Sequence, residues 1–502
     1  MPSCLRCRSL WRWSVIPVLV LFIELTPAGA AAQDYAITNL GTLCQSNDVP
    51  ASCDSRAFDV NNSGQVVGTS RVNGALIGSK CFRTAPNQTI NPATDKLDVA
   101  PPKWESYGCE AYSINDNGSV AGTRWAPLWT PGVPVAFLYG SSMTTLRTDA
   151  LNCPSSGLDP PGTGLPFGCR LSGAFALNNL GTIVGRAQTA DTSYHDYTFD
   201  AFRVHLPANS FTDLGTLPLP SLTNTSQALG INDLNMIVGS SYTVPGGVVQ
   251  RAVLFDGDAV SDLGTLGGNA CTFCSSAANA INNHRLGKVV GWSTLSVSGL
   301  RHAFSLELPQ GRSDMVDLGD LCLGDEHGFC RSNAFAINLS GRIVGESETQ
   351  YGSDSTHAFV YRSQTGVMED LNSSLSPVDR VKWDLTDARG VNDLGQIVGT
   401  GVYLGKYVRA YRLDPLAPQL ITNLSEILEH FNLTDRGVAR NLGAKLRAIQ
   451  NALAPTDRAA ACGQTGDFDH EVRTQAGRGL TPHQATTMMA GAALLQRELN
   501  CR

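Results

Sequence analysis

The chain has 502 residues, of which 42% are apolar and only 16% charged, with 50 Gly and 25 Pro. Sparse charge with abundant glycine excludes an acidic disordered protein and a long coiled coil, because both need charge-rich sequence. The formal net charge of -7 argues against a nucleic-acid partner, because phosphate binding relies on clustered Lys and Arg. This composition predicts a turn-rich β architecture.

Residues 1–32 have the pattern of a secretory signal peptide. Three arginines precede an apolar run at 15–23, and small residues offer a cleavage site after Ala30 or Ala32. The alternative is an N-terminal membrane anchor, but the run falls short of the roughly 20 residues that span a bilayer and contains Pro17. We therefore expect a secreted or periplasmic protein with no membrane span in its mature chain.

One pattern recurs seven times after the leader: an apolar residue, Asn, a short polar turn and an apolar strand that ends in Gly. The final glycines of successive copies are 54, 63, 54, 52, 54 and 54 residues apart. Such regularity indicates repeated copies of one structural unit. The copies occupy residues 57–68, 111–122, 174–185, 228–239, 278–291, 334–345 and 388–399.

Each copy predicts a β-hairpin with a three-residue loop whose third residue has positive φ. Glycine adopts this conformation without a Cβ penalty, and asparagine is the best substitute. The residues expected there are Gly64, Gly118, Gly181, Asn235, Gly287, Gly341 and Gly395.

Two more apolar segments follow each hairpin, so each unit of about 54 residues holds four short β segments, as a propeller blade does. We predict a seven-bladed β-propeller over residues 33–424 and a small α-helical domain over 425–502. Two near-identical segments, 35–40 and 419–424, are alternative closing strands of the last blade.

The repeat resembles the extracellular HAF repeat family of bacteria. The sequence SDLGTLGGNA at 261–270, the INDLGQIVG-like hairpins and HAF at 302–304 and 357–359 carry this resemblance over residues 35–424. It implies a secreted, propeller-like repeat protein with no catalytic residues assigned.

Twelve cysteines remain after the leader, an even number that agrees with an oxidising compartment. Their positions in the repeats predict local pairs, with one pair assigned by elimination (Cys81 with Cys109) and one left to the C-terminal region. The CTFC sequence at 271–274 has an alternative interpretation as a redox motif or half a zinc site, but the chain after the leader contains no second CxxC. The predicted disulfides are Cys44–Cys53, Cys81–Cys109, Cys153–Cys169, Cys271–Cys274, Cys322–Cys330 and Cys462–Cys501.

The C-terminal region has helical periodicity, and Thr481, Pro482 and Gln484 predict a helix start with a capping box. The stretch from 462 to 501 resembles the FIMAH module of secreted bacterial proteins, which implies an accessory or anchoring role. The matching positions are Phe468, Val472, Gly477, Leu480, Thr481, Gln484 and Ala485.

Motifs for metalloprotease, serine hydrolase or nucleotide chemistry are missing from the sequence, so we predict no cofactor, no metal and no catalytic residue. His302 and His357 occupy the same slot of the repeat, which favours a structural role over metal ligation. Residues 115–118 resemble part of a calcium loop but lack its distal glutamate, and the hairpin explains them.

Three tryptophans, Trp104, Trp125 and Trp292, are candidate ligand contacts, with packing between blades as the alternative. The leading interpretation is a non-enzymatic extracellular protein that binds a glycan, an envelope component or a protein. One alternative is a carbohydrate-active hydrolase or lyase with carboxylates such as Glu105 or Asp384. Converging carboxylates in a central funnel would favour it. A purely structural envelope or matrix protein is a third interpretation.

Overall fold

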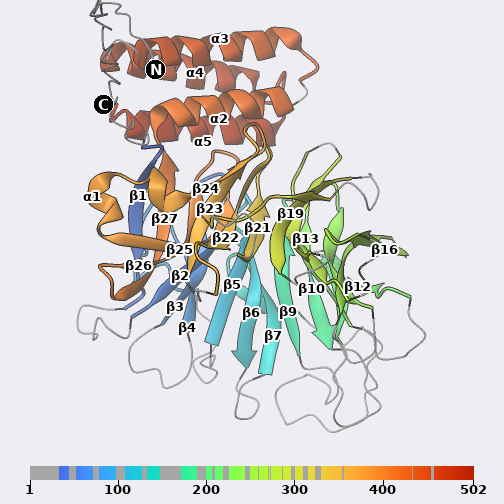
Figure 1. Ribbon diagram of the computed structural model, residues 1–502. Coiled ribbons are helices and arrows are strands. Elements are labelled where there is room, and N and C mark those ends of the chain that lie inside the picture. Colours follow the sequence, from blue (N-terminus) through green and yellow to red (C-terminus); the bar gives the residue numbers. More distant parts are fainter. Residues whose placement is uncertain are drawn as a thin grey trace, which may run out of the picture. The chain divides into compact units, whose positions relative to one another are not determined.

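The structure is a computed structural model (Figure 1). It describes residues 33–44, 53–71, 79–97, 108–126, 133–146, 171–188, 199–205, 210–218, 225–243, 249–257, 259–268, 271, 273–284, 286–295, 300–308, 315–322, 330–352, 355–431, 433–453 and 457–501. The expected signal peptide lies outside these residues.

The described strands form seven antiparallel sheets, six of four strands and one of three, which confirms the predicted seven-bladed propeller. Blades one to three comprise β2 (Ser55–Val60), β3 (Val66–Arg71) and β4 (Ser79–Arg83); β5 (Gly108–Ile114), β6 (Val120–Ala126), β7 (Val133–Tyr139) and β8 (Met143–Thr145); β9 (Ser172–Leu177), β10 (Thr182–Gln188), β11 (Phe199–His205) and β12 (Ser210–Gly215). Blades four to six comprise β13 (Ser226–Ile231), β14 (Ile237–Tyr242), β15 (Gln250–Asp256) and β16 (Ala259–Gly264); β17 (Ser276–Ile281), β18 (Lys288–Thr294), β19 (Arg301–Glu307) and β20 (Val316–Asp317); β21 (Ser332–Ile337), β22 (Arg342–Glu348), β23 (Thr356–Arg362) and β24 (Val367–Asp370).

The seventh blade joins the two ends of the propeller. Its strands β25 (Trp383–Val391), β26 (Ile397–Tyr403) and β27 (Tyr407–Pro415) are completed by β1 (Tyr35–Gly41), which pairs with β27 from Tyr35 opposite Pro415. The N-terminal segment 35–40 is therefore the closing strand. The alternative segment 419–424 lies in a helix.

The first strands of adjacent blades contact one another, so these strands line the axis of the propeller. The hairpin that follows each first strand turns as predicted: all seven residues at the third loop position have φ between 59° and 82°. We call the end of the propeller that carries these hairpin loops the turn edge, and the other end the opposite edge.

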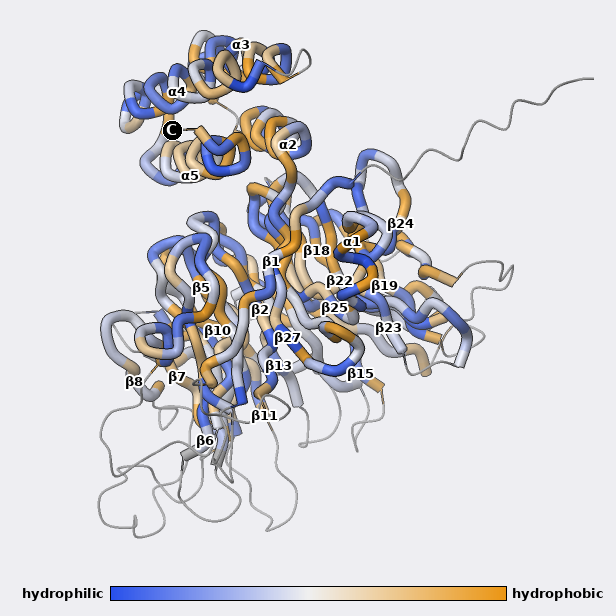
Figure 2. The backbone as a smooth tube through the Cα atoms, turned by 90° about the vertical axis from the view of Figure 1, so that its left-hand side faces the viewer, coloured by the Kyte–Doolittle hydropathy of each residue, from blue (hydrophilic) through white to orange (hydrophobic). Residues whose placement is uncertain are grey.

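Apolar side chains pack between neighbouring sheets. The third strand of each blade carries a segment equivalent to HAF at 302–304. The third residue of this segment is a buried phenylalanine in five blades: Phe82, Phe137, Phe202, Phe304 and Phe359. Phe304, for example, shares one cluster with Val238 of the preceding blade. Figure 2 shows hydrophobic residues along the strands and on the first C-terminal helix.

Four helices follow the propeller: α2 (Ala417–His430), α3 (Arg436–Leu453), α4 (Arg458–Gln475) and α5 (Pro482–Glu498). They share one apolar core, and α5 begins with the predicted capping box of Thr481 and Gln484. The expected domain boundary after residue 424 falls inside α2. A short 3-10 helix, η2 (Leu371–Ser374), and α1 (Pro377–Arg380) link β24 to β25. Among the described residues, none of the helices is long and apolar enough to cross a membrane.

Five disulfides lie within the described residues: Cys44–Cys53, Cys81–Cys109, Cys271–Cys274, Cys322–Cys330 and Cys462–Cys501. They match five of the six pairs expected from the sequence. The sixth expected pair, Cys153 with Cys169, lies outside the described residues.

Candidate functional site: the axial pocket at the turn edge

The asparagine of each repeat lies at the axis, directly after the first strand of its blade. The side-chain Nδ2 of each one donates a hydrogen bond to the backbone carbonyl of the next, over 2.9 to 3.2 Å. The last bond runs from Asn392 back to Asn61 and completes the circle. We call this buried set the asparagine ring: Asn61, Asn115, Asn178, Asn232, Asn282, Asn338 and Asn392.

The same side chains also shape the hairpin loops. The Oδ1 of Asn178 accepts hydrogen bonds from the backbone N–H groups of Leu180 and Thr182, at 3.1 and 2.8 Å. One asparagine therefore fixes its own turn and ties its blade to the next. The repeat pattern shows that this residue is the same in all seven copies, but nothing in the pattern indicates its partner in the next blade.

A second circle, which we call the second ring, is formed by the residue that follows each asparagine in its loop. In most blades its side-chain oxygen accepts the backbone N–H of the equivalent residue in the preceding blade, as between Asn62 N–H and Asp116 Oδ1 at 2.8 Å. Leu339 has no side-chain acceptor, so this ring is interrupted between blades five and six. Its members are Asn62, Asp116, Asn179, Asp233, Asn283, Leu339 and Asp393.

Three carboxylates of this ring converge around shared donors. The Nδ2 of Asn62 lies 3.1 Å from an oxygen of both Asp116 and Asp393, so those oxygens are at most twice that distance apart. Asn179 bridges Asp116 to Asp233 in the same way. Burial raises the pKa of Asp393, and the charge of Asp116 raises it further, against the opposing hydrogen bond from Leu339 N–H.

The two rings line a pocket of about 150 Å³. This volume holds a few water molecules, but it is below the roughly 300–1,000 Å³ of pockets that enclose drug-sized ligands. The carboxylate oxygens facing it already accept hydrogen bonds from neighbouring blades. The arrangement binds the blades together and leaves room only for a very small polar guest.

The helices contact this turn edge (Figure 1). Asn423 of α2 donates to the carbonyl of Leu394 at 2.7 Å, and Leu394 is part of the helical core. His483, near the start of α5, lies 3.5 Å from Asp116. Arg497 pairs with the buried Asp414 of β27 at 2.9 Å. Arg342 of blade six donates to Asn423 Oδ1 at 2.8 Å, so the helical region is attached to the propeller at blades two, six and seven.

The candidate tryptophans do not come together. Trp125 and Trp292 are half-buried near the opposite-edge ends of β6 and β18, in blades two and five. The guanidinium of Arg301 lies 5.0 Å from the ring centre of Trp292. Trp104 and Glu105 lie outside the described residues.

The HAF histidines join the last two strands of their blades. His302 Nδ1 lies 2.9 Å from Asp317, and His357 Nδ1 lies 2.7 Å from Asp370. Asp384, which the hydrolase interpretation singled out, lies 3.5 Å from His357 Nε2. Both contacts agree with the structural role expected of the HAF histidines.

Blade three carries an aspartate where five of the other six blades carry a basic residue, blade two having Val135. Asp200 precedes the alanine of its strand, as His302 and Arg251 do, and it faces Asp213. Burial raises the pKa of Asp200 to about 7, and the charge of Asp213 contributes to the shift. Comparison of the repeat sequences reveals this exception once it is known that the residue before the alanine pairs with an aspartate of the next strand.

Residues 189–478 match the model of a family described as "Protein of unknown function (DUF3466)". This match covers more than half of the chain. The chain belongs to the DUF3466 family. No curated protein matches it.

Several solved structures align with this chain at low similarity. The extracellular domain of BT4673 from B. thetaiotaomicron aligns at 12% identity and a TM-score of 0.38, over 75% of this chain and 40% of that one. An α-L-arabinofuranosidase from Fusarium graminearum aligns at 8% identity and a TM-score of 0.35, over 77% and 99%. A puromycin-hydrolyzing peptidase of Mycobacterium tuberculosis aligns at 11% and 0.29, over 64% and 53%. Similarity at this level carries no functional argument.

Proposed function

We propose that this DUF3466 protein is a secreted or periplasmic, non-enzymatic binding protein that holds an extracellular glycan or protein at the opposite edge of its propeller. The observation that carries the proposal is the attachment of the helices to the turn edge, through Leu394, His483 and Arg497. Rigid scaffolds present recognition residues on loops, and the described residues of the opposite edge take no part in these three contacts.

Other features support export and the finer relationship. Disulfides persist in oxidising compartments, and the N-terminal 1–32 segment has the pattern of a signal peptide. The proposed HAF-repeat relationship is supported by the histidine–aspartate pairs of blades five and six, and the proposed FIMAH-like module by the capping box of α5. In this view the propeller, up to β27, carries the ligand and the helices from α2 onward form the accessory module, which moves the expected boundary from 424 back to the start of α2.

The convergence of Asp116, Asp233 and Asp393 favours a second candidate, a carbohydrate-active hydrolase, because paired carboxylates are the machinery of glycoside hydrolysis. Against it, these carboxylates accept hydrogen bonds from neighbouring blades, and the pocket of about 150 Å³ is small. The binding protein is therefore the better-supported function.

The experiment applies residues 33–502 to a glycan array and to a panel of polysaccharides with analysis of released reducing ends. We expect binding without new reducing ends. Replacing a contributing tryptophan, in Trp104→Ala, Trp125→Ala or Trp292→Ala, should weaken binding by about 2 kcal/mol, roughly 30-fold. Leu234→Ala, an exposed apolar residue of the turn edge, is the matched control and should bind normally.

Two outcomes would overturn the proposal. Reducing ends released by the wild type and lost in Asp393→Asn would establish the hydrolase. If ligand binding were unaffected in all three tryptophan variants but lost in turn-edge variants, the ligand would bind at the turn edge and not at the opposite edge.

A further inference from the structure

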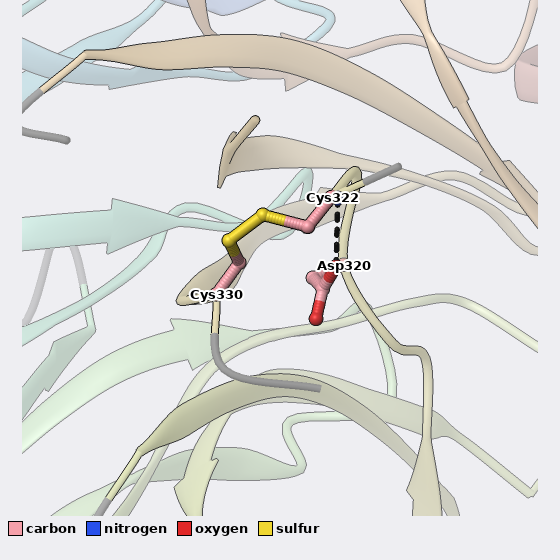
Figure 3. Close-up of side chains that lie close together, drawn as sticks. All are labelled: Asp320, Cys322 and Cys330. Atoms are coloured by element: carbon pink, nitrogen blue, oxygen red, sulfur yellow. Dashed lines mark hydrogen bonds between the residues drawn. A yellow bond between two sulfur atoms is a disulfide. The ribbon is translucent and has the colours of Figure 1, made fainter. Parts of the chain in front are cut away.

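A compact group of metal-binding side chains lies at the junction of blades five and six. One ligand atom from each of Asp320, Cys322 and Cys330 lies within 4.8 Å of the others, and the two cysteines form a disulfide (Figure 3). Asp320 Oδ1 accepts the backbone N–H of Cys322 at 2.7 Å, which fixes the carboxylate beside the sulfur atoms.

His302, on the neighbouring strand β19, is the candidate fourth ligand, through a ring nitrogen. Its Nε2 lies 3.5 Å from Asp320 Oδ2 without reaching hydrogen-bond geometry, although the side chain is more than nine-tenths buried. The ring also interacts with the backbone of Cys330. Its Nδ1 is held by Asp317 at 2.9 Å. A carboxylate on the far ring nitrogen is the usual support of a metal-binding histidine, because it orients the ring and increases the basicity of Nε2.

The other repeats show that this combination is a departure from the pattern. At the junction of blades seven and one, Cys44 and Cys53 form the equivalent disulfide, and the N–H of Cys44 donates to Thr42 in place of an aspartate. The histidine slot there holds Arg409, which donates to the carbonyl of Cys53. Threonine and arginine fit a structural junction, whereas aspartate and histidine are metal ligands.

We propose that reduction of the Cys322–Cys330 disulfide creates a tetrahedral Zn²⁺ site made of Cys322, Cys330, Asp320 and His302. Ligand bonds of about 2.0–2.3 Å place neighbouring ligand atoms about 3.3–3.8 Å apart, and the His302–Asp320 separation of 3.5 Å already meets this requirement. His302 lies outside the group whose ligand atoms are all within 4.8 Å of one another, so the sulfur atoms have to move toward its Nε2 once their bond is broken. The oxidised protein holds the disulfide, and the reduced protein holds the metal.

The chemistry is a thiol–disulfide exchange followed by metal binding. A dithiol reductant attacks one sulfur through its thiolate, forms a mixed disulfide and then releases it by closing its own disulfide. Two electrons pass to the protein, which gains two thiols. Zn²⁺ then displaces the two thiol protons into solvent, because thiolates are the ligands.

The test reduces residues 33–502 with graded dithiothreitol, removes the reductant without air and adds Co²⁺ or Zn²⁺. We expect one metal ion per reduced chain, with the thiolate-to-cobalt charge-transfer absorption. Peptide mapping should show that metal slows alkylation of Cys322 and Cys330 at least about tenfold. Cys44 and Cys53 in the same sample should be alkylated at an unchanged rate.

Two sets of variants control the assignment. His302→Arg combined with Asp320→Thr installs the residues of the Cys44–Cys53 junction, so the chain keeps a combination it already uses, and metal affinity should fall at least about 100-fold. His357→Ala removes the other HAF histidine, which has no cysteine pair beside Asp370, and should leave metal binding unchanged. Unprotected Cys322 and Cys330, undiminished affinity of the double variant, or failure to obtain folded protein with this pair reduced would each overturn the proposal.

Discussion

At the scale of single residues, the slot before the HAF alanine determines whether the last two strands of a blade carry a favourable or an unfavourable charge pair. His357 and Arg251 face aspartates of the following strand, whereas Asp200 faces Asp213 with a charge of the same sign. A buried carboxyl in such a pair keeps its proton to higher pH. Blade three therefore carries an unfavourable charge pair when Asp200 ionises.

Asp200→Asn should stabilise the protein increasingly as the pH rises. In the folded state the pKa of Asp200 is raised from 3.8 to about 7. The contribution of this carboxyl to the free energy of unfolding is therefore fully present below pH 3.8 and is lost as the pH rises through 7. At pH 8 the gain in the free energy of unfolding should be on the order of 2 kcal/mol, after allowance for solvent screening. Urea unfolding from pH 4 to pH 8 measures it. Asp262→Asn, which faces Arg251, should instead destabilise, and equal curves for Asp200→Asn and wild type would contradict the prediction.

At the scale of elements, the last glycine of each repeat has a steric reason. A Cβ built on Gly239 would lie 1.9 Å from the carbonyl oxygen of Gln227 on the paired strand. The same contact recurs beside a register shift in each hairpin, for example between Ala228 and Gly230. The second strand approaches the first so closely at this irregularity that only glycine fits.

Gly239→Ala should lower the free energy of unfolding by about 2–3 kcal/mol, because the methyl group forces backbone atoms apart. Thermal and urea unfolding measure the effect. Gly140→Ala is the matched control, since a Cβ there meets nothing within 4 Å, and it should be nearly neutral. Equal stability of the two variants would show that the bulge yields without cost.

The repeats predicted the number of blades and the hairpin turns because these depend on local sequence. Two features depended on distant contacts and were not predictable. Segments 35–40 and 419–424 have near-identical sequences but different structures. The first pairs with β27 as a strand, beginning at Tyr35 opposite Pro415, and the second lies in α2. The partner of Asn61, Asn115, lies 54 residues away in the next blade, so the asparagine ring appears only once the propeller has closed.

At the scale of the whole molecule, the asparagine ring fastens the closing blade to the first. Asn392 donates to the carbonyl of Asn61 across 331 residues of sequence. Asn392→Ala also removes the acceptor for Gln396 N–H, so buried groups lose their partners. We expect a loss of about 2–4 kcal/mol in the free energy of unfolding. Asn117→Ala, in an exposed loop position, should change the free energy of unfolding by less than about 0.5 kcal/mol. A similar loss in both variants would show that the asparagine ring does not stabilise the closed propeller.

Among the contacts between propeller and helices, an apolar one uses a loop position whose burial differs between blades. Leu394 is 1% exposed among helical side chains, whereas Leu234, at the same position of blade four, is 59% exposed. Leu394→Asp buries an unpaired carboxylate against Leu424 and Gly491, so the helices should detach or melt at a lower temperature while the disulfide-linked propeller stays folded. Calorimetry should show a second, lower transition, and limited proteolysis should cut near α2. Leu234→Asp should keep the wild-type profile; a single shared transition in Leu394→Asp would mean that this leucine does not hold the helices to the propeller.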